Sequence, residues 1–219
     1  MTKKSKIEAV IFDMDGVLLD TESVCYECWL SAGSEFGILN VESLFRSCVG
    51  QNKGDTLLLL SKTLGSEEKA RDFYERTGEF FSKIERERGL QKMDGVDFCL
   101  SLLKQNNIRL AVASSTRREA VERQLRNAGI FDYFESVTTG DLVEHSKPAP
   151  DIYLRALSSL NVDAKQCISV EDSPNGIRAS CAARIRCVMV PDQIAPDDEI
   201  KKSAWKIVSS LKEIPEIVL

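Results

Sequence analysis

Short apolar runs alternate with amphipathic stretches along most of the chain after Gly89. With a similar run near the start, the predicted strands span residues 7–12, 108–115, 134–140, 166–172, 185–191 and 206–210. Continuous apolar runs of this length are typical of strands that are buried on both faces, and strands that alternate with helices favour a parallel sheet. We therefore predict an α/β fold, with a doubly wound (Rossmann-like) parallel sheet and helices on both of its faces.

The segment from residue 22 to residue 88 has a different pattern. Charged residues alternate there with apolar ones at three- and four-residue spacing, which is typical of amphipathic helices that pack on one another. The predicted helices span residues 22–37, 53–65 and 66–89. We predict two domains: an α/β core formed by residues 1–21 and 89–219, and an inserted helical cap formed by residues 22–88.

Charge and cysteine content restrict the partners and the compartment. The formal net charge of -5 has the wrong sign for binding a phosphate backbone, which argues against nucleic acid. The apolar run before the first aspartate is too short for a signal-peptide core or a membrane span. Seven scattered cysteines indicate reduced thiols, and Cys25 and Cys28 are expected to be two small residues on one helix. We expect a cytoplasmic monomer.

The helix predicted over residues 116–129 carries signals at both ends. Thr116 and Glu119 have the spacing of a capping box, in which the threonine hydroxyl accepts a hydrogen bond from the first turn. Gly129 is the expected stop.

Polar residues follow four of the predicted strands, at the point where each strand ends. In open α/β sheets, ligands bind outside the carboxyl ends of the strands. The residues at these ends, or on the loop that follows, are Asp13 and Asp15, Ser114 and Ser115, Asp141 and Lys147, and Glu171 and Asp172. Their convergence predicts a functional site at one rim of the sheet.

These residue types suit metal-assisted phosphoryl transfer. Asp13, Asp15 and Asp172 offer the hard oxygen ligands that Mg²⁺ prefers, and a hydroxyl with an ammonium suits a dianionic phosphate. A carboxylate oxygen of Asp13 could then attack phosphorus and form an aspartyl phosphate. Asp15 could protonate the leaving oxygen and later deprotonate the attacking water.

Four segments resemble the motifs of a known family. "FDMDGVLLDT", "VASST", "SKPAPDIY" and "SVEDSPNGIRASCAA" are similar, in order and over nearly the whole chain, to the four motifs of the haloacid dehalogenase superfamily of aspartate-nucleophile phosphotransferases. The resemblance is to the subgroup that carries a helical cap directly after the first motif. It implies a Rossmann-like core, a Mg²⁺ cofactor and a phosphorylated small-molecule substrate.

The same resemblance implies a role for each site residue. Asp13 would be the nucleophile and a metal ligand, and Asp15 would be the acid/base and would offer its backbone carbonyl to the metal. Asp172 would bind the metal, with Glu171 as a ligand or as an orienting group beside it. Ser114 and Lys147 would bind the phosphoryl group, and Lys147 would also neutralise Asp13. We also expect Ser115, beside Ser114, to bind phosphate.

The dehalogenases that gave the superfamily its name lack an aspartate at the position of Asp15, so its presence favours phosphoryl transfer to or from oxygen. The nearest resemblances are to β-phosphoglucomutase and to sugar-phosphate phosphatases. Lys53 falls where the mutase carries a phosphate-binding arginine, and both a substrate contact and a solvated loop position remain open for it. Cys25 replaces a histidine of the mutase, which argues against that activity. We predict a phosphatase of sugar or polyol phosphates.

Three other functions are open alternatives. β-Phosphoglucomutase activity is the nearest of them. A signalling receiver also has a phospho-accepting aspartate on a doubly wound sheet, but its acceptor follows an early acidic pair and it has no helical insert. A binding protein without activity is disfavoured by the intact set of site residues.

Overall fold

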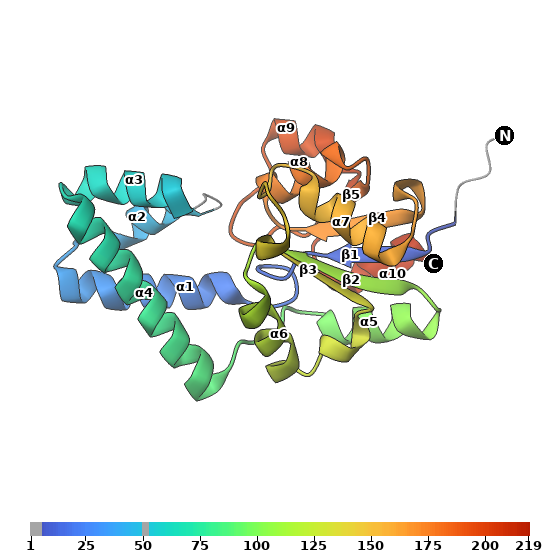
Figure 1. Cartoon of the computed structure of the whole chain (residues 1–219), viewed down its shortest axis with the longest axis horizontal. Coiled ribbons are helices and arrows are strands. Elements are labelled where there is room, and N and C mark those ends of the chain that lie inside the picture. The colour runs from blue at the N-terminus through green and yellow to red at the C-terminus, as the bar shows by residue number, and fades with distance from the viewer. Residues whose placement is uncertain (1–5, 50–52) are drawn as a thin grey trace. The chain divides into compact units, whose positions relative to one another are not determined.

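A six-stranded parallel sheet forms the centre of the fold, in the strand order β3-β2-β1-β4-β5-β6 (Figure 1). The computed structural model describes residues 6–49 and 53–219. The strands are β1 Ala9–Phe12, β2 Arg109–Ser114, β3 Ser136–Thr139, β4 Cys167–Glu171, β5 Arg186–Met189 and β6 Lys206–Ile207.

The strand order places β1 between β2 and β4. From β1 the chain adds β2 and β3 on one side of the sheet and then crosses to add β4, β5 and β6 on the other. This reversal is the switch point at which doubly wound sheets bind ligands beyond their strand ends. The predicted fold class is thus confirmed. Each strand is two or three residues shorter than its predicted run.

Helices cover both faces of the sheet. They are α5 Val96–Gln105, α6 Arg118–Asn127, α7 Asp151–Leu160, α8 Pro174–Ala182, α9 Asp198–Ser203 and α10 Ile214–Val218, with the 3₁₀ turns η1 Phe131–Tyr133, η2 Gly140–Leu142, η3 Ala164–Gln166 and η4 Leu211–Glu213. Side chains of α7 and α8 pack on the face of β1 that carries Ala9 and Ile11, and α5 lies on the opposite side of the sheet (Figure 1). Successive β1 residues point to opposite faces, so a strand covered on both must be apolar throughout.

The chain divides into two compact units, one formed by the residues up to Asp20 with Gln91–Leu219 and the other by Thr21–Leu90. The second unit contains α1 Thr21–Phe36, α2 Val41–Cys48, α3 Lys53–Leu64 and α4 Glu67–Arg88. The roles of catalytic core and cap, with boundaries after residues 21 and 88, stay a prediction.

Helix α2 was not predicted from the sequence. Its buried residues Val41, Leu44, Phe45 and Cys48 recur at three- and four-residue spacing, which is the signal of an amphipathic helix. They pack with Trp29 in the apolar core of the second unit.

Within the part of the chain that the structure describes, none of the helices combines the length and the apolar character that a membrane crossing needs.

Candidate active site

Asp13 follows the last residue of β1, at the switch point of the sheet. Its N–H group donates to the carbonyl of Val170 in β4 over 2.9 Å, so the pairing of β1 with β4 extends to the aspartate. Its Oδ1 accepts a hydrogen bond from the N–H group of Met14 over 2.8 Å. Asp13 is only 7% exposed. A buried carboxylate in this position needs positive charge nearby.

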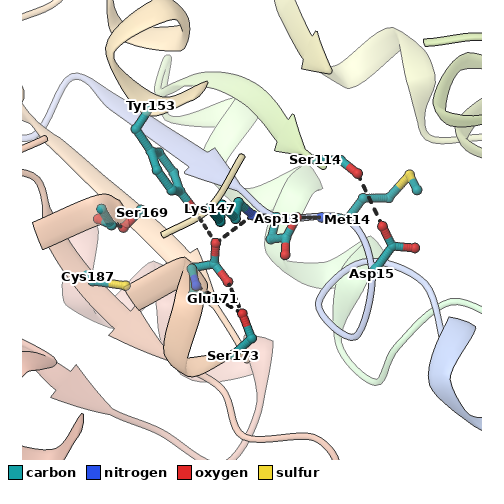
Figure 2. Close-up of polar contacts among 12 residues, drawn as sticks. Asp13, Met14, Asp15, Ser114, Lys147, Tyr153, Ser169, Glu171, Ser173 and Cys187 are labelled. Carbon is teal, nitrogen blue, oxygen red and sulfur yellow. Dashed lines mark hydrogen bonds and ion pairs between the residues drawn. The ribbon is translucent and has the colours of Figure 1, made fainter. Parts of the chain in front are cut away.

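Lys147 supplies that charge. Its Nζ lies 2.9 Å from Oδ1 of Asp13 and 2.7 Å from Oε1 of Glu171, and its side chain is 6% exposed (Figure 2). The hydroxyl of Tyr153 also donates to Oε1 of Glu171, and the Lys147 ammonium lies 5.4 Å from the centre of the Tyr153 ring. Residues of three separate segments therefore form one buried network around two carboxylates.

The network shifts the pKa values of its members. Burial opposes the charge of Lys147, but the Asp13 and Glu171 carboxylates outweigh it, so the pKa of Lys147 is raised above its usual value. Burial, and then the charge of Asp13, raises the pKa of Glu171, although Lys147 and Tyr153 act in the opposite direction. Burial beside Glu171 raises the pKa of Tyr153, which therefore stays a neutral donor.

Three carboxylates converge at this point. Oxygen atoms of Asp13, Glu171 and Asp172 lie within 4.8 Å of one another. The site thus brings three carboxylates together at the ends of β1 and β4. An all-oxygen donor set of this kind fits a hard divalent cation such as Mg²⁺. Three of the four predicted metal ligands thus lie together.

The side chain of Asp15, the fourth predicted ligand, has other partners. Its Oδ2 accepts hydrogen bonds from the hydroxyls of Ser114, over 3.1 Å, and of Thr116, over 3.0 Å. Ser114 is the last residue of β2 and is fully buried. Figure 2 shows Ser114 directed toward Asp15, with Asp13 nearby. Asp13 and Asp15 therefore meet different groups: an ammonium at Asp13 and hydroxyls at Asp15.

The predicted capping role of Thr116 is wrong. Helix α6 has Arg117 as its N-cap residue, without a side-chain hydrogen bond to its first turn. Oδ1 of Asp141, on the loop after β3, instead accepts a hydrogen bond from the N–H group of Arg118 over 3.0 Å. The Thr116 hydroxyl donates to Asp15 in place of capping the helix. The predicted stop is confirmed, since Gly129 follows the helix with a φ of 71°.

Gly16 and Gly176 leave the space that the carboxylates of Asp172 and Glu171 occupy. Gly16 has a φ of 72°, which side chains rarely allow, and a Cβ there would lie 2.5 Å from Oδ2 of Asp172. Gly176 is in α8, and a Cβ there would lie 1.9 Å from Oε2 of Glu171. Any side chain at either position would displace a carboxylate of the site.

Ser115 and Lys53 are the two remaining residues that were predicted to bind phosphate or substrate. Ser115 is exposed, directly after β2. His145, for which no site role was predicted, is exposed on the loop before Lys147, with its Nδ1 3.0 Å from Oδ1 of Asp151. Lys53 begins α3 in the second unit, with its Nζ 5.3 Å from the centre of the Tyr74 ring. Its predicted contact with substrate stays a prediction.

Sequence reasoning missed Tyr153 and Thr116 as members of the site. Tyr153 is the last residue of the third motif, "SKPAPDIY", and follows Lys147 by six residues, so its place in the motif was the available signal. Thr116 ends the second motif, "VASST", and its spacing from Glu119 suggested a helix cap instead.

Comparisons with known proteins agree with the architecture and the motifs. The family model described as "Haloacid dehalogenase-like hydrolase" matches residues 10–190. The chain is 37% identical over 180 residues to the phosphorylated carbohydrates phosphatase of Thermotoga maritima, with 82% of each chain covered. It is 29% identical to hexitol phosphatase B of Escherichia coli, with 98% of this chain and 97% of the relative covered.

Among solved structures, a protein of Thermotoga maritima that is provisionally named a β-phosphoglucomutase superposes with a TM-score of 0.81. It is 31% identical, with 97% of this chain and 98% of that one covered. The family match extends from β1 to β5 and includes all four motifs. The chain therefore belongs to the haloacid dehalogenase-like hydrolases.

Proposed function

We propose that the protein is a Mg²⁺-dependent phosphatase that hydrolyses a small phosphorylated carbohydrate, either a sugar phosphate or a polyol phosphate, through an aspartyl phosphate at Asp13. One observation carries the proposal. The carboxylate of Asp13 lies beside a buried ammonium and two further carboxylates, while Asp15, two residues on, is held by hydroxyls. This arrangement supports a role for Asp13 in bonding to phosphorus and a role for Asp15 in proton transfer.

In the first half of the reaction, a carboxylate oxygen of Asp13 bonds to phosphorus and the ester P–O bond breaks. Asp15 gives its proton to the departing oxygen, so the carbohydrate leaves as a neutral alcohol. In the second half, Asp15 takes a proton from water while the water oxygen bonds to phosphorus. The bond between Asp13 and phosphorus then breaks, inorganic phosphate leaves, and both aspartates return to their starting forms.

The other residues of the site reduce the repulsion between two anions. Lys147 is paired with Asp13 and is placed to donate to a phosphoryl oxygen as well, together with the hydroxyl of Ser114 and that of Ser115. Asp13, Glu171 and Asp172, with the backbone carbonyl of Asp15, would hold Mg²⁺, which offsets negative charge on the phosphate and on Asp13.

The relatives guide the choice of substrate. The names of two of them state activity on phosphorylated carbohydrates and on hexitol phosphates, and a third carries a mutase name. The mutase is therefore the second candidate. Cys25, at the position where the resemblance places a histidine in the mutase, favours the phosphatase.

Phosphorus NMR distinguishes the two activities. The purified protein is incubated with Mg²⁺, β-glucose 1-phosphate, a trace of glucose 1,6-bisphosphate, and a set of hexose and hexitol 6-phosphates. Release of inorganic phosphate supports the phosphatase, and the resonance that shrinks identifies the substrate. Conversion of glucose 1-phosphate to glucose 6-phosphate without phosphate release identifies a mutase and contradicts the proposal. An Asp13→Asn sample is the control for contaminating phosphatases.

We also propose that the enzyme acts in the cytoplasm as a monomer. All seven cysteines are free thiols, as expected of a reducing compartment. Light scattering on the eluate of a sizing column measures the mass in solution, for which one chain is 24.4 kDa.

A further inference from the structure

Two hydroxyls donate to the same oxygen of Asp15. Ser114 Oγ lies 3.1 Å and Thr116 Oγ1 lies 3.0 Å from Oδ2. The hydroxyls are the donors in both hydrogen bonds, and Oδ2 of Asp15 is the acceptor. Two donors at one oxygen fix the rotation of the carboxylate about its side-chain torsions.

Ser114 cannot keep this hydrogen bond if it also binds substrate. A serine hydroxyl has one hydrogen to donate. The proposed function directs that hydrogen to a phosphoryl oxygen, which removes it from Asp15. The N–H group of Thr116 donates to Ser114 Oγ over 3.1 Å, but this contact adds no second hydrogen to the serine. Asp15 therefore loses one of its two hydroxyl donors when a phosphoryl group binds Ser114.

The hydroxyl of Thr116 is not used to cap helix α6, although its position in the sequence suggested this role. Asp141 caps the helix instead, because its carboxylate accepts a hydrogen bond from the N–H group of Arg118. The Thr116 backbone is also held in place, because its carbonyl accepts a hydrogen bond from the N–H group of Gly140 over 3.1 Å. Thr116 is thus anchored by its backbone and keeps its side chain on Asp15.

We propose that Thr116 is a positioning residue, which keeps the Asp15 carboxylate aligned for proton transfer after Ser114 has turned to the phosphoryl group. The inference rests on the proposed function. Thr116 donates a hydrogen bond throughout and transfers no proton itself. Its contribution is to prevent Asp15 from rotating away between the protonation of the leaving oxygen and the deprotonation of water.

Leaving-group dependence tests this role. Thr116→Val removes the hydroxyl and keeps the shape, whereas Thr116→Ser keeps the hydroxyl. The substrates are sorbitol 6-phosphate, whose alkoxide needs a proton to leave, and p-nitrophenyl phosphate, whose phenolate does not. We expect Thr116→Val to lose about 10-fold or more of kcat/KM on the alkyl phosphate, as for loss of a hydrogen bond to a charged group. On the aryl phosphate the loss should be smaller, and Thr116→Ser should restore both.

A double-mutant cycle with Asp15→Ala gives an independent measurement. If Thr116 acts through Asp15, the Thr116→Val change should have almost no further effect on turnover of the aryl phosphate once Asp15 is absent. Thermal unfolding of each variant shows whether it is folded.

The contradicting results are distinct. Equal losses on both substrates, an inactive Thr116→Ser variant, or additive losses in the cycle show a merely structural role for Thr116. A wild-type protein that releases phosphate neither from these two substrates nor from the hexose and hexitol phosphates of the NMR experiment contradicts the proposed function, and this inference with it.

Discussion

Replacing Gly176 by alanine tests the position of the Glu171 carboxylate. A Cβ at residue 176 would lie 1.9 Å from Oε2 and 2.0 Å from Cδ of Glu171, so either the glutamate or helix α8 must move. Glu171 is fully buried and accepts hydrogen bonds from Lys147 and Tyr153. Moving its carboxylate by the required distance breaks at least one of these contacts.

The magnitude follows from opposing contributions. Alanine in place of an unstrained helical glycine stabilises by about 0.5–1 kcal/mol. Overpacking a buried site costs about 1–3 kcal/mol, and a buried polar group left without its partner costs about 1–3 kcal/mol more. The unfavourable contributions are larger, so we expect the free energy of unfolding to fall by about 2 kcal/mol or more. We also expect a loss of activity, because Glu171 is displaced from the carboxylate cluster.

Gly78→Ala is the matched control. Gly78 is an exposed glycine inside α4, and a Cβ built on it would meet no heavy atom within 4 Å among the described residues, apart from its chain neighbours and the nearby backbone of its own helix. This change should stabilise its helix by the ordinary amount of about 0.5–1 kcal/mol. Calorimetric unfolding and phosphate release are measured on both variants. A Gly176→Ala variant that is as stable and as active as the wild type would refute the reasoning.

Three further substitutions test the site. Asp15→Asn should reduce turnover of alkyl phosphates by at least about 100-fold, as for loss of a general acid/base, and affect p-nitrophenyl phosphate less; steady-state kinetics that show equal losses would mean that Asp15 has no role in proton transfer. Lys147→Met leaves Asp13 and Glu171 without their cation and should lower the free energy of unfolding by about 3–5 kcal/mol. Added Mg²⁺ should restore part of this lost free energy. An unchanged melting temperature contradicts the prediction. Tyr153→Phe removes one hydrogen-bond donor from buried Glu171 and should lower the free energy of unfolding, measured by denaturant titration, by about 1–3 kcal/mol. An unchanged free energy of unfolding would mean that this hydrogen bond does not stabilise the fold.

The sheet could be predicted from the sequence because its signals are local. A strand that is covered on both faces must be apolar along its whole length, and β1 with its run "AVIF" shows this directly. The rule that ligands bind beyond the strand ends then brought Asp13, Lys147 and Glu171 to one rim, and the structure joins these three through ion pairs.

The rest of the site depends on partners that are distant in the sequence. Thr116 has the local signal of a helix cap, but its hydroxyl donates to a carboxylate 101 residues away, and Asp141 takes over the cap. Tyr153 looks like an ordinary helical core residue until its hydroxyl is seen to donate to Glu171. Local propensity indicates what a residue can do, and the tertiary fold decides which of its partners it meets.

The most direct test of the central claim is mass spectrometry of the chain during turnover. The Asp15→Asn variant is mixed with p-nitrophenyl phosphate and Mg²⁺. The departing phenolate needs no proton, so the aspartyl phosphate should still form, and it should accumulate because its hydrolysis needs Asp15. The reaction is quenched in acid and the protein is digested. We predict that the peptide containing Asp13 carries the added mass of one phosphoryl group, and that this mass is absent when Asp13 is also replaced by asparagine. Two results would contradict the account: product formed before the quench with no phosphoryl group found on the chain, or a phosphoryl group attached to a residue other than Asp13.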